Sequence, residues 1–339
     1  MTNKNKTFLV TGAAGFIGFH LCNNLIKKKY KVVGIDAMTD YYDVNLKKDR
    51  LNILKKNKNF IFHKQKLENF KSLKSLFKKY NPSFIVHLGA QAGVRYSLKK
   101  PRTYIDSNII GTFNILELAK IYKPVHLLCA STSSVYGASK KQLFKETDTT
   151  DEPLSLYAAS KKSCEVIAHS YSYNWNIPIT IFRFFSVYGP WGRPDMAFYK
   201  FLELAEKNKN IDVYNYGKMY RDFTYVDDLI KSIEKLINKI PSKKVHGDSL
   251  SSVAPFRVVN IGNSSKQSLE KAIKLLEKYY GKTFKKNYIE MQKGDVVSTM
   301  ASSKLLKTLI RYSPNTNLEK GIKKFIVWLK DYKSKKIDL

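Results

Sequence analysis

Short apolar runs alternate with amphipathic segments along the first half of the chain. Six runs have the length and composition of buried strands, at residues 7–10, 31–35, 60–63, 84–87, 126–129 and 180–184. Between them, apolar residues recur at helical spacing near residues 15–28, 46–56, 70–80, 101–122 and 155–174. This alternation predicts an α/β fold with a doubly wound parallel sheet, covered by helices on both faces.

The pattern changes near residue 187. Loops rich in glycine, proline and aromatic residues, such as VYGPWGRPDM, alternate with shorter helices from there on. We therefore expect a Rossmann domain over residues 1–186 and a smaller α+β region over residues 187–339. The smaller region should be partly interwoven with the first and should close over the carboxyl edge of the sheet. Residues 240–255 predict a surface loop, and residues 318–332 predict an amphipathic terminal helix.

The composition is that of a globular enzyme, with 43% hydrophobic residues in 339. No apolar run is long enough to span a membrane, and the N-terminus runs into the first strand without room for a signal peptide. Cys22, Cys129 and Cys164 lie inside apolar segments, which predicts buried free thiols. We expect a cytoplasmic protein that does not insert into membranes.

The net charge of +32 has two interpretations. Only eight of the 60 basic residues are arginine, and the lysines are scattered along the chain on presumed polar helix faces. This distribution favours lysine as a default surface residue, and a weak polyanion-binding surface is the alternative. No nucleic-acid-binding module is recognisable, so no nucleic-acid partner is expected. The six histidines form no closely spaced pair or HExxH motif, so no metal site is predicted.

The run TGAAGFIGFHL predicts a dinucleotide-binding loop. Gly12, Gly15 and Gly18 follow a predicted strand and open a predicted helix, which lets backbone approach a pyrophosphate at the helix N-terminus. Asp36 closes the second strand, where its carboxylate would bind ribose hydroxyls and repel a 2′-phosphate. NAD is therefore favoured over NADP. Further cofactor contacts are expected from the loop itself and from the small-residue loop after the fourth strand, at Phe16, Ile17, Leu88, Ala90 and Gln91.

Tyr157 and Lys161 are four residues apart, on one face of a predicted helix. A phenol has an ordinary pKa of about 10, and a nearby ammonium or cationic nicotinamide favours its phenolate form. The pair follows the run Ser131-Thr132-Ser133-Ser134, which ends the fifth strand at the edge where ligands bind. Capping of a turn is the alternative role of these hydroxyls. The pattern predicts proton and hydride transfer at a carbon that bears a hydroxyl.

These motifs resemble the extended short-chain dehydrogenase/reductases, chiefly the nucleotide-sugar epimerases and dehydratases. Several longer stretches are similar to UDP-glucuronate 4-epimerases: DYYDVNLK, AQAGVRYSL, STSSVYG, FFSVYGPWGRPDMA, VYNYGKMYRDFTYVDD and APFRVVNIGNS. The resemblance extends from about residue 6 to residue 332, and the GPWGRPDMA block is its most specific part. It implies a homodimer built on the helices over residues 101–122 and 155–174. The sequence does not identify the pathway, and capsular or lipopolysaccharide synthesis is the expected use of UDP-galacturonate.

The resemblance implies that the chain is an isomerase that interconverts UDP-glucuronate and UDP-galacturonate through a 4-keto intermediate, with bound NAD. Tyr157 is then the base, and Lys161 orients it and the nicotinamide ribose. Thr132, Ser133 and Ser134 would contact the 4-oxygen and the carboxylate. Because a 4-keto uronic acid is a β-keto acid, the enzyme must hold the carboxylate in an orientation that does not favour loss of CO2.

Five further residues are carried over by motif as substrate ligands. Ser186 and Arg193 would hold the carboxylate, because a planar guanidinium can bind it through two hydrogen bonds. Arg221 would bind the diphosphate, and Asp295 would bind the uridine ribose. Arg95 either faces the substrate or caps its own loop.

One departure from the family pattern concerns the cofactor. After the third strand the family shows an aspartate that bonds the adenine amino group, whereas this chain has Lys66 in the run HKQKLEN. Adenine is then held by another group, or NAD binds less tightly.

Other functions of the same family stay open. Decarboxylation of UDP-glucuronate to a pentose and 4-epimerisation of a neutral UDP-hexose are the nearest alternatives. A 4,6-dehydratase would place an acidic pair after the threonine, where this chain has Ser133 and Ser134. A cofactor-sensing regulator without turnover is the non-enzymatic alternative, and Tyr157, Lys161 and Thr132 argue against it.

Overall fold

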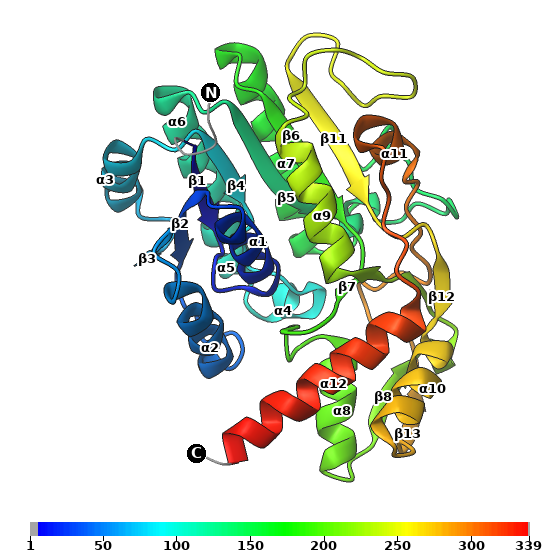
Figure 1. Cartoon of the computed structure of the whole chain (residues 1–339). Coiled ribbons are helices and arrows are strands. Elements are labelled where there is room, and N and C mark those ends of the chain that lie inside the picture. Colours follow the sequence, from blue (N-terminus) through cyan, green and yellow to red (C-terminus); the bar gives the residue numbers. More distant parts are fainter. Residues whose placement is uncertain (1–5, 338–339) are drawn as a thin grey trace.

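Seven parallel strands form the central sheet of the computed structural model, which describes residues 6–337 (Figure 1). The strands are β1 (Thr7–Thr11), β2 (Lys31–Asp36), β3 (Phe60–Lys64), β4 (Phe84–His87), β5 (His126–Thr132), β6 (Ile179–Phe184) and β11 (Phe256–Ile261). They lie in the order β11-β6-β5-β4-β1-β2-β3, which reverses direction between β1 and β4. The expected doubly wound fold is confirmed, and such a reversal leaves a crevice at the carboxyl ends of the two strands.

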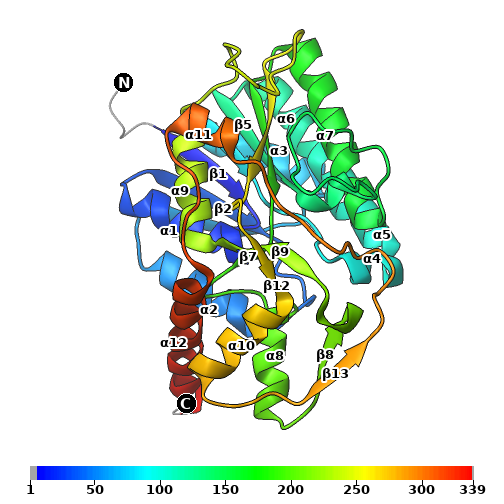
Figure 2. The same cartoon turned by 90° about the vertical axis from the view of Figure 1, so that its right-hand side faces the viewer.

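Helices cover both faces of the sheet (Figure 2). One face packs against α1 (Phe16–Lys27), α9 (Val226–Ile237) and α11 (Lys304–Ile310), and the other against α3 (Phe70–Tyr80), α6 (Gly111–Tyr122) and α7 (Leu156–Trp175). Successive strand residues alternate between the two layers, with Phe8 and Val10 in the first and Leu9 in the second. Both faces are buried, which explains why these strands are continuous apolar runs in the sequence.

The sequence pattern does not predict β11, which follows the polar segment 240–255 and pairs with β6 at the edge of the sheet. All six of its residues are buried, so the strand shows no alternation of polar and apolar positions. Helices α9 and α11 also come from the second half of the chain and pack on the sheet. Residues beyond 187 therefore complete the sheet layer in addition to forming the smaller region.

A second core lies below the carboxyl edge of the sheet in the view of Figure 1. It is built from α8 (Ala197–Glu206), β8 (Ile211–Tyr214), α10 (Leu269–Tyr280), β13 (Lys286–Ile289) and α12 (Leu318–Ile337). Strands β8 and β13 pair in parallel. The terminal helix follows the expected amphipathic pattern, with Ile322, Phe325, Ile326 and Leu329 buried on its inner side.

Short elements connect the two cores. Strands β7 (Val187–Tyr188) and β10 (Thr224–Tyr225) pair in parallel, and β9 (Tyr220–Asp222) pairs with β12 (Lys266–Ser268) in antiparallel fashion. Around the sheet edge lie α2 (Val44–Lys55), α4 (Val94–Lys99), α5 (Pro101–Tyr104), the π-helical turn η2 (Ile105–Ile110), and the 3₁₀ turns η3 (Ser133–Tyr136) and η4 (Asn215–Gly217). The helix expected over residues 101–122 is thus continuous but widened at η2.

None of the helices among residues 6–337 is both long and apolar enough to cross a membrane. Cys22, Cys129 and Cys164 are buried free thiols, as expected.

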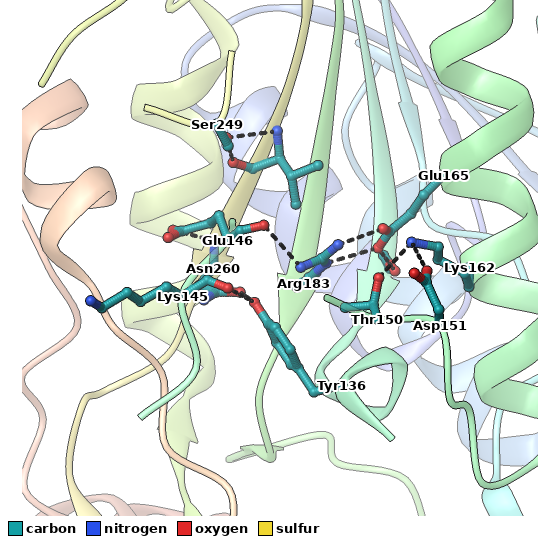
Figure 3. A network of polar contacts seen from close by, with 12 residues as sticks. Tyr136, Lys145, Glu146, Thr150, Asp151, Lys162, Glu165, Arg183, Ser249 and Asn260 are labelled. Atoms are coloured by element: carbon teal, nitrogen blue, oxygen red, sulfur yellow. Dashed lines mark hydrogen bonds and ion pairs between the residues drawn. The ribbon is translucent and has the colours of Figure 1, made fainter. Parts of the chain in front are cut away.

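A buried polar network fixes α7 against the sheet (Figure 3). The guanidinium of Arg183 on β6 donates two hydrogen bonds to the carboxylate of Glu165 on α7, at 3.0 and 2.7 Å. Ser131 on β5 donates to the same carboxylate at 2.6 Å. Both ionic side chains are nearly inaccessible, at 4% and 6% exposed. Breaking such a pair leaves an uncompensated buried charge, so the network holds α7 in one position relative to β5 and β6.

Glu146 lies beside this network and accepts a hydrogen bond from the backbone N–H of Asn260. Glu146 is only 9% exposed. Burial raises the pKa of the Glu146 carboxyl to about 7. The folded chain therefore keeps a proton that the unfolded chain releases above its ordinary pKa, and stability falls as pH rises toward 7.

We predict that Glu146→Gln removes this loss of stability. The amide oxygen can still accept the Asn260 bond, and no charge has to be buried at high pH. The gain in free energy of unfolding should be greater at pH 8 than at pH 5.5, by about 2 kcal/mol. Urea denaturation at the two pH values measures it, with the exposed Glu152→Gln as control. An equal effect at both pH values would refute the assignment.

Candidate active site

A cavity of about 680 Å³ opens at the carboxyl ends of β1, β4, β5 and β6. Every site residue expected from the sequence lines this cavity: Gly12, Gly15, Phe16, Ile17, Gly18, Asp36, Leu88, Ala90, Gln91, Arg95, Thr132, Ser133, Ser134, Tyr157, Lys161, Ser186, Arg193, Arg221 and Asp295. Its volume is that of a typical small-molecule site. The second core supplies its far wall, including Tyr199 on α8 and Tyr214 on β8.

The glycine loop lies against the loop that follows β4. Gly12 has a φ of +69°, and a Cβ there would be 2.9 Å from the backbone nitrogen of Gly89. A Cβ on Gly18 would be 2.0 Å from the carbonyl oxygen of Gly12. The Thr11 hydroxyl accepts a hydrogen bond from the Gly89 N–H at 2.9 Å, which joins the two turns. Only glycine permits this approach, and the N-terminus of α1 is left open toward the cavity.

The carboxylate of Asp36 is held by hydrogen bonds from two backbone N–H groups. One carboxylate oxygen accepts from the N–H of Met38 at 2.8 Å, and the other from the N–H of Ala14 at 3.1 Å. These bonds place the carboxylate at the end of β2 beside the glycine loop. Each carboxylate oxygen has a second lone pair, so the group can still accept hydrogen bonds from ribose hydroxyls.

The segment after β3 lines the cavity with residues other than Lys66. Gln65, Leu67 and Glu68 are part of the lining, whereas the exposed Lys66 is not. Glu68 accepts a hydrogen bond from the Ser107 hydroxyl at 2.8 Å. Glu68 therefore presents a carboxylate to the cavity two residues beyond Lys66, and the sequence pattern did not predict this.

Tyr157 and Lys161 lie in the first turns of α7, whose N-terminus is capped by Ser155. Lys161 is 3% exposed, and Thr132 at the end of β5 is 8% exposed. The Thr132 hydroxyl accepts the Ser134 N–H at 3.2 Å, so it caps the turn η3. The alternative that these hydroxyls cap a turn is therefore confirmed for Thr132. The run Ser131-Thr132-Ser133-Ser134 also lines the cavity.

A second layer of polar residues fixes this catalytic face and was not visible in the sequence. Asn108, in the π-helical turn, donates to the Gln91 carbonyl at 3.1 Å and to the Ser160 hydroxyl at 2.9 Å. The Asn108 oxygen accepts the Gln91 N–H at 2.7 Å. The loop after β4 is thereby tied to α7 one residue before Lys161. A π-helical turn often marks a functional site. It is defined by its backbone hydrogen bonds, so the sequence alone did not reveal it.

His87 lies beneath the same face. It is 1% exposed and bonds to the hydroxyls of Thr11 and Thr112 at 2.8 and 3.1 Å. Burial, and secondarily the charge of Lys161, lowers the pKa of His87 to about 3. The imidazole is therefore neutral at physiological pH and acts as a hydrogen-bonding spacer between the glycine loop and α6.

Arg193 lies at the turn between β7 and α8 and is already paired. Its guanidinium donates to the Asp195 carboxylate at 2.9 and 2.5 Å, and Tyr41 donates to the same carboxylate at 3.0 Å. Burial opposes the charged guanidinium, but Asp195 outweighs this and raises the pKa of Arg193. Arg193 thus stays cationic in the cavity, with part of its donor fork held by Asp195.

Two further arginines, Arg95 on α4 and Arg221 on β9, line the cavity near β8. Arg95 forms an ion pair with Asp295 at 3.1 Å and stacks over the ring of Tyr214, with 4.0 Å between guanidinium carbon and ring centroid. Arg221 donates to the backbone carbonyls of Tyr220 and Val297. Burial lowers the pKa of Arg221, although Asp295 opposes this. This end of the cavity therefore has cationic groups that a bound anion would stabilise.

Comparisons with known proteins agree with this geometry. A family model described as GDP-mannose 4,6 dehydratase matches residues 9–325. The chain is 47% identical to a probable UDP-glucuronate 4-epimerase of Rhizobium meliloti, over 95% of this chain and 96% of that protein. It is similar to the crystal structure of UDP-glucuronic acid 4-epimerase from Bacillus cereus in complex with UDP-glucuronic acid and NAD. That similarity has a TM-score of 0.87 and 36% identity, and it covers 96% of this chain and 99% of that one.

A variant of the same Bacillus cereus enzyme is also similar, with a TM-score of 0.87 and 35% identity over 96% of this chain and 99% of that one. In it a tyrosine is replaced by phenylalanine, and the complex contains NAD and a 4-deoxy-4-fluoro analogue of UDP-glucuronic acid.

We predict that Gly18→Ala disrupts the glycine loop. The new methyl group would clash with the Gly12 carbonyl, which should cost about 1–3 kcal/mol of stability and abolish retention of a bound dinucleotide. Thermal unfolding and chromatography of released nucleotide measure the two effects. Gly281→Ala is a matched control, because Gly281 has a φ of +84° but open space around it. If Gly18→Ala kept as much nucleotide as the control, the loop would not be the binding site.

Proposed function

Because the chain belongs to the UDP-glucuronate 4-epimerase family of extended short-chain dehydrogenase/reductases, we propose that it interconverts UDP-glucuronate and UDP-galacturonate by NAD-dependent chemistry at carbon 4. The proposal is carried by one observation. Tyr157, Lys161 and Thr132 line the same cavity as the glycine loop and as Arg193 and Ser186. A proton-transfer group, a cofactor cradle and a carboxylate-binding group thus share one space.

The residues of the cradle fit NAD. The contact between Gly12 and Gly89 leaves no room for side chains, so a pyrophosphate can reach the backbone N–H groups at the start of α1. Asp36 would accept hydrogen bonds from the adenosine ribose and repel a 2′-phosphate. When bound, NAD would accept a hydride from carbon 4 of the sugar and return it in the second half of the reaction.

Tyr157 is the proposed base. It takes the proton of the 4-hydroxyl as the carbon is oxidised and gives it back when the carbonyl is reduced. Lys161 lies one helical turn later on α7 and lines the same cavity, where its ammonium group would orient the base and the nicotinamide ribose. Thr132 and Ser133 would hold the 4-oxygen by hydrogen bonds. The Arg183–Glu165 pair keeps α7 in position against β5, so that Tyr157 stays close to these hydroxyls.

Arg193, Ser186 and Ser134 are the proposed ligands of the sugar carboxylate. After oxidation the carboxylate is β to a ketone, and the compound loses CO2 when the C5–C6 bond is parallel to the carbonyl π orbitals. Fixed donors that keep the carboxylate out of this alignment favour epimerisation. Arg193 can keep the carboxylate out of this alignment only if the guanidinium itself has a fixed orientation. Its ion pair with Asp195 would fix that orientation.

Arg221, Arg95 and Asp295 are the proposed ligands of the UDP portion. Arg221 has two neutral carbonyl partners and a pKa lowered by burial, so a diphosphate would supply the missing counter-charge. Asp295 can accept from ribose hydroxyls. The Arg95–Asp295 pair must then loosen or share its hydrogen bonds when the nucleotide binds.

We also propose a homodimer in the cytoplasm. The buried thiols suit a reducing compartment. Helices α6 and α7 lie side by side on the outside of the sheet (Figure 2). They expose large apolar side chains at 41–59%: Ile110 immediately before α6, Phe113 and Ile121 on α6, and Val166 and Tyr173 on α7. Large apolar side chains that are exposed on two neighbouring helices are typical of a protein–protein interface.

The first test of the activity is incubation of the purified protein with UDP-glucuronate, followed by proton NMR. We expect UDP-galacturonate without added cofactor, because NAD should copurify. A UDP-pentose as the main product would instead establish a decarboxylase. Turnover only after addition of NAD would show that the contacts near Lys66 hold adenine weakly.

We predict that Tyr157→Phe lowers turnover by about 10²–10⁴-fold, the usual contribution of a general base. Retention of NAD and binding of UDP-glucuronate should be unchanged, because the ring and the helix stay in place. Chromatography of released nucleotide measures the retained NAD, and calorimetry measures the binding of UDP-glucuronate. The exposed Tyr288→Phe is the control. Loss of binding together with turnover would assign Tyr157 a structural role.

For the dimer, sedimentation velocity at micromolar concentration should show twice the chain mass. Val166→Glu should shift the protein to monomer, because a charge is costly to bury in an apolar interface. Val253→Glu is a matched control in a loop outside this surface, with 61% exposure against 57% for Val166. A monomeric unmodified chain would contradict the proposal.

A further inference from the structure

Arg50 on α2 is a fully buried arginine whose hydrogen bonds go to neutral oxygens. One terminal nitrogen donates to the Ala14 carbonyl at 2.9 Å and to the Tyr42 hydroxyl at 2.8 Å. The other donates to the carbonyls of Trp191 and Gly192 at 2.6 and 3.3 Å. Arg50 is 0% exposed, and among residues 6–337 it forms no ion pair with a carboxylate. A buried charge without a carboxylate is costly, which indicates a specific role for these bonds.

These bonds connect two loops that are far apart in the sequence. Ala14 belongs to the glycine loop between β1 and α1. Trp191 and Gly192 belong to the turn that immediately precedes Arg193. The single guanidinium of Arg50 therefore joins the wall of the cofactor cradle to the turn that carries the carboxylate-binding arginine. A planar fork with several donors in fixed directions suits this task, and a lysine would not reproduce it.

The turn that Arg50 holds is strained. Trp191 has a φ of +61°, a left-handed conformation that is unfavourable for a bulky residue. Its indole packs against Phe19, Trp328 and Tyr332, with ring centroids 5.2–5.4 Å apart. Its carbonyl receives the shortest of the Arg50 hydrogen bonds. Such a strained conformation persists only where the surrounding residues hold it in place. The aromatic contacts hold the indole, and the hydrogen bond from Arg50 holds the Trp191 carbonyl.

We propose that Arg50 is a positioning residue that sets the direction of Arg193 in the cavity and thereby the selectivity for a uronate and the retention of its carboxylate. The inference rests on the proposed function. Without Arg50 the Trp191 turn would relax, and Arg193 would no longer hold the carboxylate away from the axis of the carbonyl π orbitals. The C5–C6 bond of the 4-keto sugar could then break. CO2 leaves, the bonding pair forms the enolate of the C4 carbonyl, and a proton from solvent adds to C5 to give a UDP-4-keto-pentose. Return of the hydride that was taken from carbon 4 would then reduce this ketone to the UDP-pentose.

The first readout is binding, independent of turnover. In the Tyr157→Phe background, Arg50→Gln should weaken binding of UDP-glucuronate by about 10- to 100-fold, the usual effect of losing a hydrogen bond to a charged group. Binding of UDP, which has no carboxylate, should be unchanged. Calorimetry measures both, at equal NAD content, because Arg50 also contacts the glycine loop. Equal weakening of the two ligands would show a general structural role and overturn the proposal.

The second readout is the product ratio. With Tyr157 intact, Arg50→Gln should raise the ratio of UDP-pentose to epimer by a similar factor, measured by proton NMR. An unchanged ratio would contradict the proposal. Arg50→Lys, which keeps the charge without the fork, should be intermediate in both readouts and serves if Arg50→Gln does not fold. Arg102→Gln is the control, because Arg102 is 85% exposed and paired only locally with Asp106.

The two readouts separate this inference from the proposed function. If the unmodified protein forms no epimer, the proposed function fails. The binding comparison then still decides whether Arg50 controls recognition of a carboxylate.

Discussion

The close approach of two backbone turns at the centre of the sheet is the constraint on which the site depends. Strands β1 and β4 are neighbours, and the chain leaves them toward opposite faces, which opens a crevice beyond the point where the turns after them touch. Gly12 and Gly89 touch with no space for a side chain, and the Thr11 hydroxyl joins them. From that contact, hydrogen bonds through His87 and Thr112 lead to Cys164 on α7. The cofactor cradle and the catalytic helix are thus parts of one packed unit.

Around this unit, buried arginines connect segments of the chain by hydrogen bonds, whereas elsewhere in the core apolar side chains pack against one another. Arg183 is balanced by Glu165 and secures the catalytic helix, whereas Arg50 is balanced only by oxygens of the backbone and Tyr42. Both connect segments that are distant in the sequence. Directional hydrogen bonds fix orientation more narrowly than apolar contacts do, because they weaken steeply when the angle changes. A site that must control the orientation of a sugar carboxylate benefits from that property.

Two of the arginines in the cavity are paired with carboxylates, although the chain as a whole is strongly basic. Arg193 is paired with Asp195, and Arg95 with Asp295. Each pair keeps its arginine in a defined direction before substrate binds, which reduces the ordering that binding requires. Arg221, with neutral carbonyl partners, is the group most in need of an anion.

The sequence by itself determined six of the seven strands, the helices between them and the expected site residues of the cavity, because those signals are local. A buried strand is an apolar run, and a glycine loop or a Tyr157–Lys161 pair is defined by spacing along a few turns. The sequence did not determine β11, whose all-buried pattern lies far from the strands it joins. Nor did it determine the roles of Asn108, Glu68 or Arg50. Their partners are distant in the chain, and only tertiary packing decides which carbonyls and carboxylates a buried side chain meets.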